Sequence, residues 1–168
     1  MIYVLYGQPA SGKTTLGKLL AKHLETPFII DGDEFREMFT NQNYGRDGRD
    51  ENIKNANAVV TYLNKKGQNN DWMCIYVRDE KDENHIDGIT VNSETDVIMC
   101  LVNPYEHLRK ELKNNNKDQV TEVLLESNRD LRRSYRVEDF EDGGPNYVLN
   151  TDKEVEESWD KLQELLKL

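Results

Sequence analysis

Cysteine is scarce in this chain, whose 168 residues include two cysteines and no CxxC pair. Two thiols cannot build the disulfide framework of a small secreted domain, so we expect Cys74 and Cys100 to be buried, unreactive thiols. No window approaches the roughly 18 apolar residues of a membrane span. The first residues lack the basic start and long apolar stretch of a secretory signal. These absences predict a soluble, cytoplasmic protein without a membrane partner.

Positive charge is the minority sign, with 22 Lys and Arg against 32 Asp and Glu, for a net charge of −10. Nucleic acids and anionic membranes attract proteins through positive fields that offset phosphate repulsion. The charge balance therefore argues against nucleic acid as a general partner, although a local basic site remains compatible with it. The length fits one domain, and we expect residues 1–168 to form it.

Short apolar segments alternate along the chain with segments of helical spacing. Strands of a parallel sheet read as continuous apolar runs, because helices cover both faces of the sheet. The alternation therefore predicts a three-layer α/β fold. The expected strands are residues 2–6, 28–30, 97–102, 120–125 and 147–149. The expected helices are residues 13–24, 33–39, 50–66, 103–113 and a final helix after residue 151.

Local signals mark two helix starts and one insertion. Asn103 followed by Pro104 fits an N-cap and a proline in the first turn, so a helix is expected to begin there. Thr151 and Glu154 match a capping box that would open the last helix. Within residues 72–96, two β-prone runs flank an acidic turn, which predicts an inserted hairpin.

Residues 7–14 read Gly-Gln-Pro-Ala-Ser-Gly-Lys-Thr and match GxxxxGK[ST] at every fixed position. A buried strand before them and an amphipathic helix after them are the context of a phosphate-binding loop. Backbone N–H groups of such a loop point at phosphate oxygens, and the helix dipole adds positive potential. We therefore expect ATP as a ligand, with Thr14 on Mg²⁺. The expected ATP-binding residues of the loop are Gly7, Ala10, Ser11, Gly12, Lys13, Thr14 and Thr15.

Two carboxylates follow the second expected strand, in Asp31-Gly32-Asp33. In an open parallel sheet, ligands lie beyond the carboxyl ends of the strands. One carboxylate would help to hold hydrated Mg²⁺, and one would accept the proton of an attacking hydroxyl. The predicted catalytic residues are Lys13, Asp31 and Asp33, and Asp31 is also the predicted metal ligand beside Thr14. Arg36, one turn later, suits an anionic substrate group. The alternative is an aspartate that merely caps a solvated helix.

The segment from Tyr44 to Ile53 brings an aromatic ring, arginines and an asparagine to a loop–helix junction. Such a set can stack on a base and bind a phosphate, so Tyr44, Arg49 and Asn52 are candidate substrate-binding residues. A capped helix with exposed charges is the alternative.

Arg129, Arg132, Arg133 and Arg136 have the spacing of one helix face in an otherwise acidic chain. Kinase lids use such arginines to neutralise charge on the transferring group. We therefore interpret residues 129–136 as a short helical lid, with Arg129 and Arg132 on ATP. The alternative is a solvated face that pairs with neighbouring acids.

Together these segments resemble the adenylylsulfate kinase family. After a DGDxxR element like residues 31–36, that family has GFS-x-x-D-R-x-E-N-I, which is similar to residues 44–53. Its ISPY-x-x-x-R element is similar to residues 102–109, its RDxKGLY lid to residues 129–135, and its LxTD ending to residues 149–152. The resemblance covers the chain in order, except for residues 72–96.

The resemblance implies a P-loop kinase-like fold with five parallel strands in the order 2-3-1-4-5. It also implies ATP-dependent phosphorylation of the 3′-hydroxyl of adenosine 5′-phosphosulfate (APS). Arg36, Arg49 and Asn52 would hold the phosphosulfate and ribose, Tyr44 would lie beside the substrate adenine, and Phe140 would supply a second aromatic face. A homodimer is the implied assembly.

The sequence departs from the family mainly on the acceptor side. Tyr44-Gly45 stands in place of Phe-Ser, Gly48 in place of Asp, Asn103 in place of Ser and Glu106 in place of Arg, and the lid is shorter. These changes keep open a P-loop kinase that acts on another nucleotide, a nucleoside or a modified-base hydroxyl. The third hypothesis is a non-catalytic nucleotide-binding module whose insertion docks a partner, although a nucleotide sensor needs none of the acceptor residues.

Overall fold

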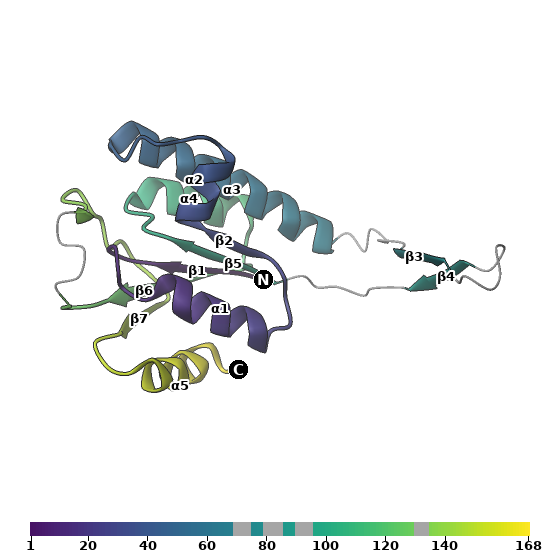
Figure 1. Ribbon diagram of the computed structural model, residues 1–168. Coiled ribbons are helices and arrows are strands. Elements are labelled where there is room, and N and C mark those ends of the chain that lie inside the picture. Colours follow the sequence, from purple (N-terminus) through teal and green to yellow (C-terminus); the bar gives the residue numbers. More distant parts are fainter. Residues whose placement is uncertain (69–74, 79–85, 90–95, 130–134) are drawn as a thin grey trace.

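Five parallel strands form the central sheet of the computed structural model, which describes residues 1–68, 75–78, 86–89, 96–129 and 135–168 (Figure 1). The strands are β1 (Ile2–Tyr6), β2 (Ile29–Asp31), β5 (Val97–Leu101), β6 (Val120–Glu126) and β7 (Tyr147–Asn150). They lie in the order β2-β5-β1-β6-β7, and Ile2 of β1 is opposite Val97 on one side and Val120 on the other. When only these five strands are numbered along the chain, β5 is the third, and the order becomes 2-3-1-4-5. The predicted fold class is therefore confirmed.

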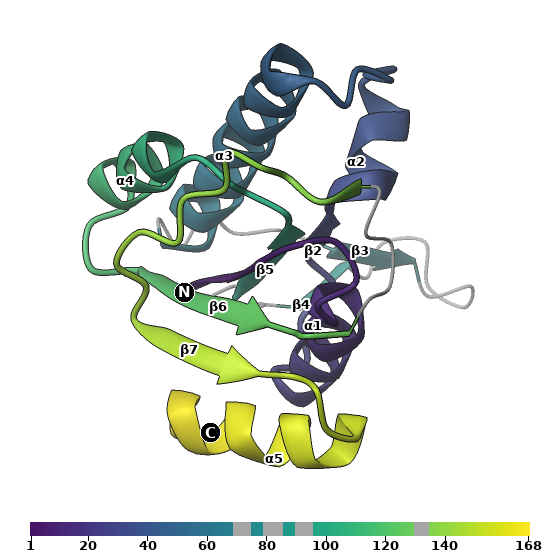
Figure 2. The same ribbon diagram turned by 90° about the vertical axis from the view of Figure 1, so that its left-hand side faces the viewer.

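Helices cover both faces of the sheet, which gives the molecule three layers (Figure 2). One face carries α1 (Lys13–His23) and α5 (Val155–Leu166), and the other carries α2 (Gly32–Met38), α3 (Arg46–Gln68) and α4 (Glu106–Asn115). The apolar core is divided in the same way: Val4 and Leu108 belong to one buried cluster, whereas Leu5 and Leu16 belong to the other. Side chains of successive strand residues leave the sheet on opposite faces, so the central strands β1 and β5 are buried on both faces. At the edge of the sheet, β7 leaves Val148 exposed.

Gly17 allows α1 to approach β5 closely. A methyl group at position 17 would lie 2.2 Å from Cys100 Sγ, which is far inside van der Waals contact. Cys100 is buried, and this burial raises the pKa of its thiol to about 12, as fits the unreactive thiol that the sequence predicts. Cys74 lies outside the described residues.

We expect Gly17→Ala to lower the free energy of unfolding by about 1–3 kcal/mol, because overpacking a core forces neighbouring groups to shift. The double variant Gly17→Ala/Cys100→Ala should lose less than the sum of the two single losses, because the clashing sulfur is gone. Urea unfolding followed by circular dichroism measures all three variants. Strictly additive losses would contradict this account of the contact.

The predicted helix start at Asn103 is wrong, because α4 begins at Glu106. Asn103 has a left-handed φ of 44°, and its carbonyl accepts a hydrogen bond from Arg109 Nη1. The first hydrogen bonds of the helix run instead to the Tyr105 carbonyl, from the N–H groups of Leu108 and Arg109. The N-cap is therefore Tyr105, two residues later than predicted.

The predicted capping box of the last helix is also wrong. The Thr151 hydroxyl donates to the carbonyls of Ser11 and Glu126, and Glu154 takes the N-cap position without a side-chain cap. By contrast with these two late starts, α3 begins earlier than predicted. It starts at Arg46, whereas the sequence predicts a helix from residue 50.

The insertion contains an antiparallel pair of strands, as the sequence predicts. β3 (Ile75–Arg78) pairs with β4 (Ile86–Ile89), and the chain rejoins the main sheet at Val97, the first residue of β5. The insertion therefore attaches at the amino ends of the parallel strands. Figure 1 shows β3 and β4 at the end of the molecule opposite the carboxyl ends of those strands.

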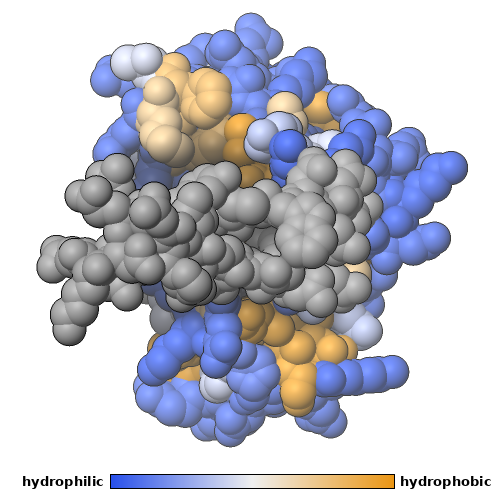
Figure 3. Space-filling view, turned by 90° about the vertical axis from the view of Figure 1, so that its right-hand side faces the viewer, coloured by the Kyte–Doolittle hydropathy of each residue, from blue (hydrophilic) through white to orange (hydrophobic). Residues whose placement is uncertain are grey.

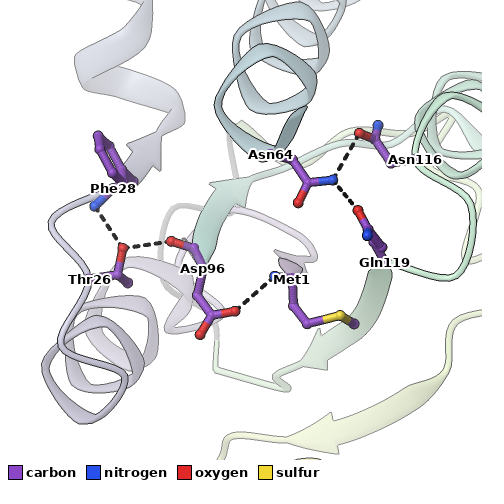
Figure 4. Close-up of polar contacts among 7 residues, drawn as sticks. All are labelled: Met1, Thr26, Phe28, Asn64, Asp96, Asn116 and Gln119. Carbon is purple, nitrogen blue, oxygen red and sulfur yellow. Dashed lines mark hydrogen bonds and ion pairs between the residues drawn. The ribbon is translucent and has the colours of Figure 1, made fainter. Parts of the chain in front are cut away.

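Hydrogen bonds within the main domain hold the chain on both sides of the insertion (Figure 4). The Met1 ammonium donates to Asp96 Oδ1 at 2.9 Å, and Thr26 Oγ1 donates to the Asp96 carbonyl at 2.6 Å. Near the end of α3, Asn64 Nδ2 donates to Gln119 Oε1 at 2.5 Å. The points where the insertion leaves and returns are thus anchored by residues outside it.

The surface at this end of the molecule is mainly hydrophilic, with smaller apolar areas next to the residues drawn in grey (Figure 3). Among the described residues, no helix combines the length and apolar character that crossing a membrane would need.

Candidate functional site

A cavity of about 720 Å³ opens beyond the carboxyl ends of β1, β2 and β5. Its walls come from the loop after β1, the residues after β2, the start of α3, the turn after β5 and the chain that follows β6 and β7. The lining residues include Lys13, Thr14, Thr15, Asp31, Asp33, Arg36, Tyr44, Arg49, Asn52, Asn103, Arg129 and Thr151. Predicted residues from separate parts of the sequence therefore meet in one cavity.

The loop after β1 has the sharply turned backbone that phosphate binding requires. Ala10 and Gly12 have left-handed φ values of 66° and 86°, and Gly12 is the N-cap of α1. At Gly7, a Cβ would lie 2.3 Å from the Leu125 carbonyl oxygen, so a side chain there would push the loop away from β6. These turns wrap the backbone around the N-terminus of α1, where N–H groups and the helix dipole favour an anion.

Lys13 spans this loop from the first turn of α1 and is 9% exposed. Its Nζ donates to the carbonyls of Gly7 at 3.1 Å and Gln8 at 2.7 Å, and to Ser11 Oγ at 3.3 Å. A positive charge is thereby held inside the loop, where an anion would also meet the backbone N–H groups.

Two side-chain contacts join the loop to distant parts of the chain. Gln8 Nε2 donates to the Val137 carbonyl and Gln8 Oε1 accepts from the Val137 N–H, both at 3.0 Å. Thr151 Oγ1 donates to the Ser11 carbonyl at 3.0 Å. The residues after β6 and β7 therefore fix the shape of the loop, which the loop sequence alone does not predict.

Thr14 and Asp31 present the hard oxygen ligands that Mg²⁺ prefers. Thr14 Oγ1 donates to Asp31 Oδ2 at 2.5 Å, so the two oxygens lie together beside the loop. Within the described part of the chain, no group of three or more His, Cys, Asp or Glu could hold a metal ion alone. Mg²⁺ commonly binds through one or two protein ligands plus phosphates and waters, so this pair fits the metal of a metal–nucleotide complex.

Asp31 and Asp33 are held differently. Asp31 is 9% exposed, and its Oδ1 accepts from the Asp33 N–H at 3.0 Å as the N-cap of α2. Asp31 therefore does cap a helix, which is the alternative that the sequence left open, and it also accepts a hydrogen bond from Thr14. Asp33 lies in the first turn of α2, where it is exposed and lines the cavity. The carboxylate best placed for an acceptor in the cavity is that of Asp33.

Arg36 positions the loop that carries Tyr44. Its Nη1 donates to the Asn43 carbonyl at 2.9 Å, and its guanidinium lies 4.6 Å from the centre of the Tyr44 ring. Arg36 is 8% exposed, and burial is the main cause that lowers the pKa of its guanidinium. Both residues line the cavity. The sequence predicted these two residues at the site, but not that Arg36 would hold the Tyr44 loop.

Three cavity residues share one face of α3. Arg49, Asn52 and Ile53 are three and four positions apart, so their side chains leave the helix on the same side. Asn52 is 3% exposed, and its Oδ1 has no hydrogen-bond partner among the described residues. A buried amide oxygen without a partner costs free energy, so it is a signal for a bound ligand group.

Arg129 reaches the rim of the cavity from the chain after β6. Its Nη2 donates to the Thr151 carbonyl at 2.6 Å, and its Nε donates to Ser127 Oγ at 3.1 Å. The rest of the predicted lid helix lies largely within residues 130–134, outside the described residues, and this includes Arg132.

Phe140 is not brought to the cavity. Its ring stacks on Tyr6 with the ring centroids 6.2 Å apart, and it packs against the core cluster rather than lining the site. Phe140 therefore does not supply the expected second aromatic face, because its ring packs against the core cluster that contains Tyr6. Tyr135 and Val137, which the sequence did not single out, do line the cavity.

Asn103 lies in a left-handed turn and lines the cavity. The sequence predicts a helix cap at this residue, which is not formed, and also a departure from the adenylylsulfate kinase pattern on the acceptor side. Its position directly after a buried strand was the available signal for its place at the cavity, because the carboxyl ends of parallel strands meet at one edge.

The chain belongs to the AAA_17 family, described as AAA domain, whose model matches residues 6–139. The match runs from the end of β1 past the loop, the acids after β2 and Arg129. No curated protein matched the sequence.

Solved structures share the fold at low sequence identity. The APS kinase of Mycobacterium tuberculosis, in complex with AMPPNP and APS, has a TM-score of 0.69 at 15% identity, with coverage of 99% of this chain and 97% of that chain. A gluconokinase from Sinorhizobium meliloti 1021 has a TM-score of 0.61 at 14% identity, covering 98% and 90%. A shikimate kinase from Bacteroides thetaiotaomicron has 0.59 at 19% identity, covering 100% and 99%. The chain therefore has a P-loop kinase fold.

Proposed function

We propose that this member of the family is an ATP-dependent kinase whose acceptor is the 3′-hydroxyl of APS. The observation that carries the proposal is the meeting of Lys13 and Asp33 in one cavity. Phosphoryl transfer is mostly positioning and electrostatics, and it needs a phosphate-binding loop facing a group that orients the attacking hydroxyl.

The choice of APS rests on the acceptor side of the cavity. Tyr44, Arg49 and Asn52 line the same cavity as the phosphate loop, and they follow one another in the order of the adenylylsulfate kinase pattern. The ring of Tyr44 suits a base, the guanidinium of Arg49 suits an anionic group, and the buried amide of Asn52 suits a sugar. The fold similarity to an APS kinase solved with AMPPNP and APS supports this choice.

In the proposed reaction, Asp33 accepts the proton of the acceptor hydroxyl as its oxygen attacks the γ-phosphorus of ATP. The bond from that phosphorus to the β–γ bridging oxygen breaks, and ADP leaves with the electron pair. Lys13 stabilises negative charge on the phosphate oxygens from inside the loop. Thr14 and Asp31 would hold Mg²⁺, which supplies further positive charge to the β- and γ-phosphates when bound.

A coupled ADP-release assay with purified protein, ATP, Mg²⁺ and APS tests the proposal. We expect ADP release that depends on APS, with 3′-phosphoadenosine 5′-phosphosulfate identified as the product by mass spectrometry. ATP binding without transfer to APS or to any other acceptor would contradict a kinase function.

A kinase of another small-molecule hydroxyl is the second candidate. The specific observation in its favour is that Tyr44 and Asn103, both at the cavity, differ from the adenylylsulfate kinase pattern. A panel of nucleotides, nucleosides and sugars with radiolabelled ATP separates the two candidates. Transfer to another member of the panel, but not to APS, would favour the second.

The insertion should be dispensable for catalysis if the cavity is the active site. It joins the amino ends of the strands, whereas the cavity lies beyond their carboxyl ends. We expect replacement of residues 72–95 by a short Gly-Ser linker to change kcat by less than about threefold, because surface insertions are usually tolerated. The ADP-release assay measures this. A large loss of kcat in a folded deletion variant would show that the insertion takes part in the reaction.

A further inference from the structure

The side chain of Gln8 makes two hydrogen bonds to a residue far along the chain. Its Nε2 donates to the Val137 carbonyl and its Oε1 accepts from the Val137 N–H, both at 3.0 Å. One planar amide therefore pairs with both backbone groups of Val137, as a residue of a neighbouring antiparallel strand would. Val137 is 4% exposed, and a buried backbone group that loses its partner costs free energy. Gln8 thus ties the phosphate loop to the part of the cavity wall that Val137 forms.

The phosphate-loop motif does not account for a glutamine at this position. In GxxxxGK[ST], the residue after the first glycine is free, so many side chains are compatible with phosphate binding. The contact with Val137 is more demanding. Asparagine is one methylene shorter, and the carboxylate of a glutamate has no hydrogen to donate to the Val137 carbonyl. An amide of this length at position 8 is therefore explained by the contact with Val137, and not by the motif.

The backbone of Gln8 holds the lysine of the loop. The Gln8 carbonyl accepts from Lys13 Nζ at 2.7 Å, which is shorter than the bonds of the same ammonium to Gly7 and Ser11. The same carbonyl accepts from the Ser11 N–H at 3.2 Å. Because one residue carries both the carbonyl and the amide, fixing the amide on Val137 also fixes the carbonyl. The position of the Lys13 ammonium therefore depends on a contact 129 residues away along the chain.

We infer that Gln8 is a positioning residue, whose side chain fixes its backbone to Val137 and thereby holds the Lys13 ammonium where the phosphates of the nucleotide bind. The inference rests on the proposed function for the nucleotide alone, since it needs ATP at the loop but no particular acceptor. Gln8 itself is not among the residues that line the cavity, so its effect on the nucleotide passes through Lys13. Small misplacements of a group that stabilises the transition state cost a large part of the rate.

Gln8→Met tests the inference, because methionine has nearly the length of glutamine but can make neither hydrogen bond through an amide. We expect AMPPNP binding to weaken by about 3- to 10-fold, as fits the net loss of a hydrogen bond, and kcat to fall by about 10- to 100-fold. Calorimetry with AMPPNP measures the first, and the ADP-release assay measures the second. Gln8→Asn keeps an amide that is too short for both bonds, so it should show the same losses and replaces Gln8→Met if that variant does not fold.

A double-mutant cycle with Lys13 separates positioning from a merely structural role. In the Lys13→Ala background there is no ammonium to position, so Gln8→Met should change AMPPNP affinity by less than about twofold. In the Lys18→Ala background, the full loss should remain, because Lys18 is an exposed lysine of the same helix. A general weakening of the loop would instead give the same loss in all three backgrounds.

Gln119 provides a matched control for the loss of a hydrogen-bonded glutamine. It is partly buried, as Gln8 is, and its Oε1 accepts from Asn64 Nδ2 at the amino ends of the strands, away from the cavity (Figure 4). Gln119→Met should lower thermal stability but leave AMPPNP affinity and kcat unchanged. Thermal unfolding of all variants separates a loss of fold from a misplaced Lys13.

The outcomes separate the inference from the proposed function. Transfer to APS by wild type overturns the inference and leaves the function intact if Gln8→Met causes no loss, or the same loss with and without Lys13. AMPPNP binding that shows the expected coupling, without transfer to any acceptor, overturns the function and supports the inference. No AMPPNP binding to wild type overturns both.

Discussion

Lys13→Ala is expected to lower kcat for ATP-dependent transfer by roughly 10³-fold or more, which is at the upper end of the loss for a transition-state-stabilising group. The Lys13 ammonium lies inside the phosphate loop, bonded to the carbonyls of Gly7 and Gln8. Its loss removes the positive charge from the loop and takes away the donor that these two carbonyls share. The ADP-release assay measures kcat, and calorimetry with AMPPNP measures the accompanying loss of nucleotide affinity.

Lys18→Ala is the matched control, because Lys18 is an exposed lysine of the same helix. It should keep wild-type kcat, which excludes a general effect of removing a lysine from α1. If Lys13→Ala turned over ATP at a rate close to that of wild type, the loop would not be the site of phosphoryl transfer.

Asp33→Asn is expected to lower kcat by about 10²–10⁴-fold, the usual contribution of a general base. The affinity for ATP should change little, because the acid that contacts Thr14 at the loop, Asp31, is kept. The amide keeps the size of the carboxylate but cannot accept a proton. The split between kcat and nucleotide affinity is therefore the diagnostic measurement, made by steady-state assay and by calorimetry with AMPPNP.

Glu34→Gln controls for the loss of a negative charge from the first turn of α2. Glu34 is exposed next to Asp33 and does not line the cavity. It should behave as wild type. Full activity of Asp33→Asn would remove the proton-accepting role and leave Asp33 as a surface acid.

The fold class followed from the sequence because its signals are local and repeated. Apolar runs such as residues 2–6 and 97–101 are short and uninterrupted, which indicates strands covered on both faces. Helix starts in the second half of the chain were less predictable. Asn103 and Thr151 have side chains that fit caps, but tertiary contacts fix them in other roles. The buried Arg109 holds the carbonyl of Asn103, and Ser11, 140 residues away, accepts from the hydroxyl of Thr151.

The candidate site was predictable wherever one short segment carries the chemistry. The phosphate loop is one contiguous motif, and the acids after β2 are another. Within each motif, the spacing along the sequence is enough to bring its own groups together. Phe140 was not placed correctly, since its environment depends on Tyr6, a residue far from it in the sequence. The same holds for Gln8, whose amide pairs with the backbone of Val137.

By itself, the sequence determined the layered architecture, the phosphate loop and the carboxylates that face it, because periodicity and motif spacing act within a few residues. Only the tertiary structure decided that Asp31 caps a helix while Asp33 faces the cavity, and that Asn103 lies there with an unpaired amide. The physical reason is hydrogen-bond satisfaction. Whether a polar group is paired depends on every neighbour that folding brings to it, and the Thr151–Ser11 contact spans 140 residues.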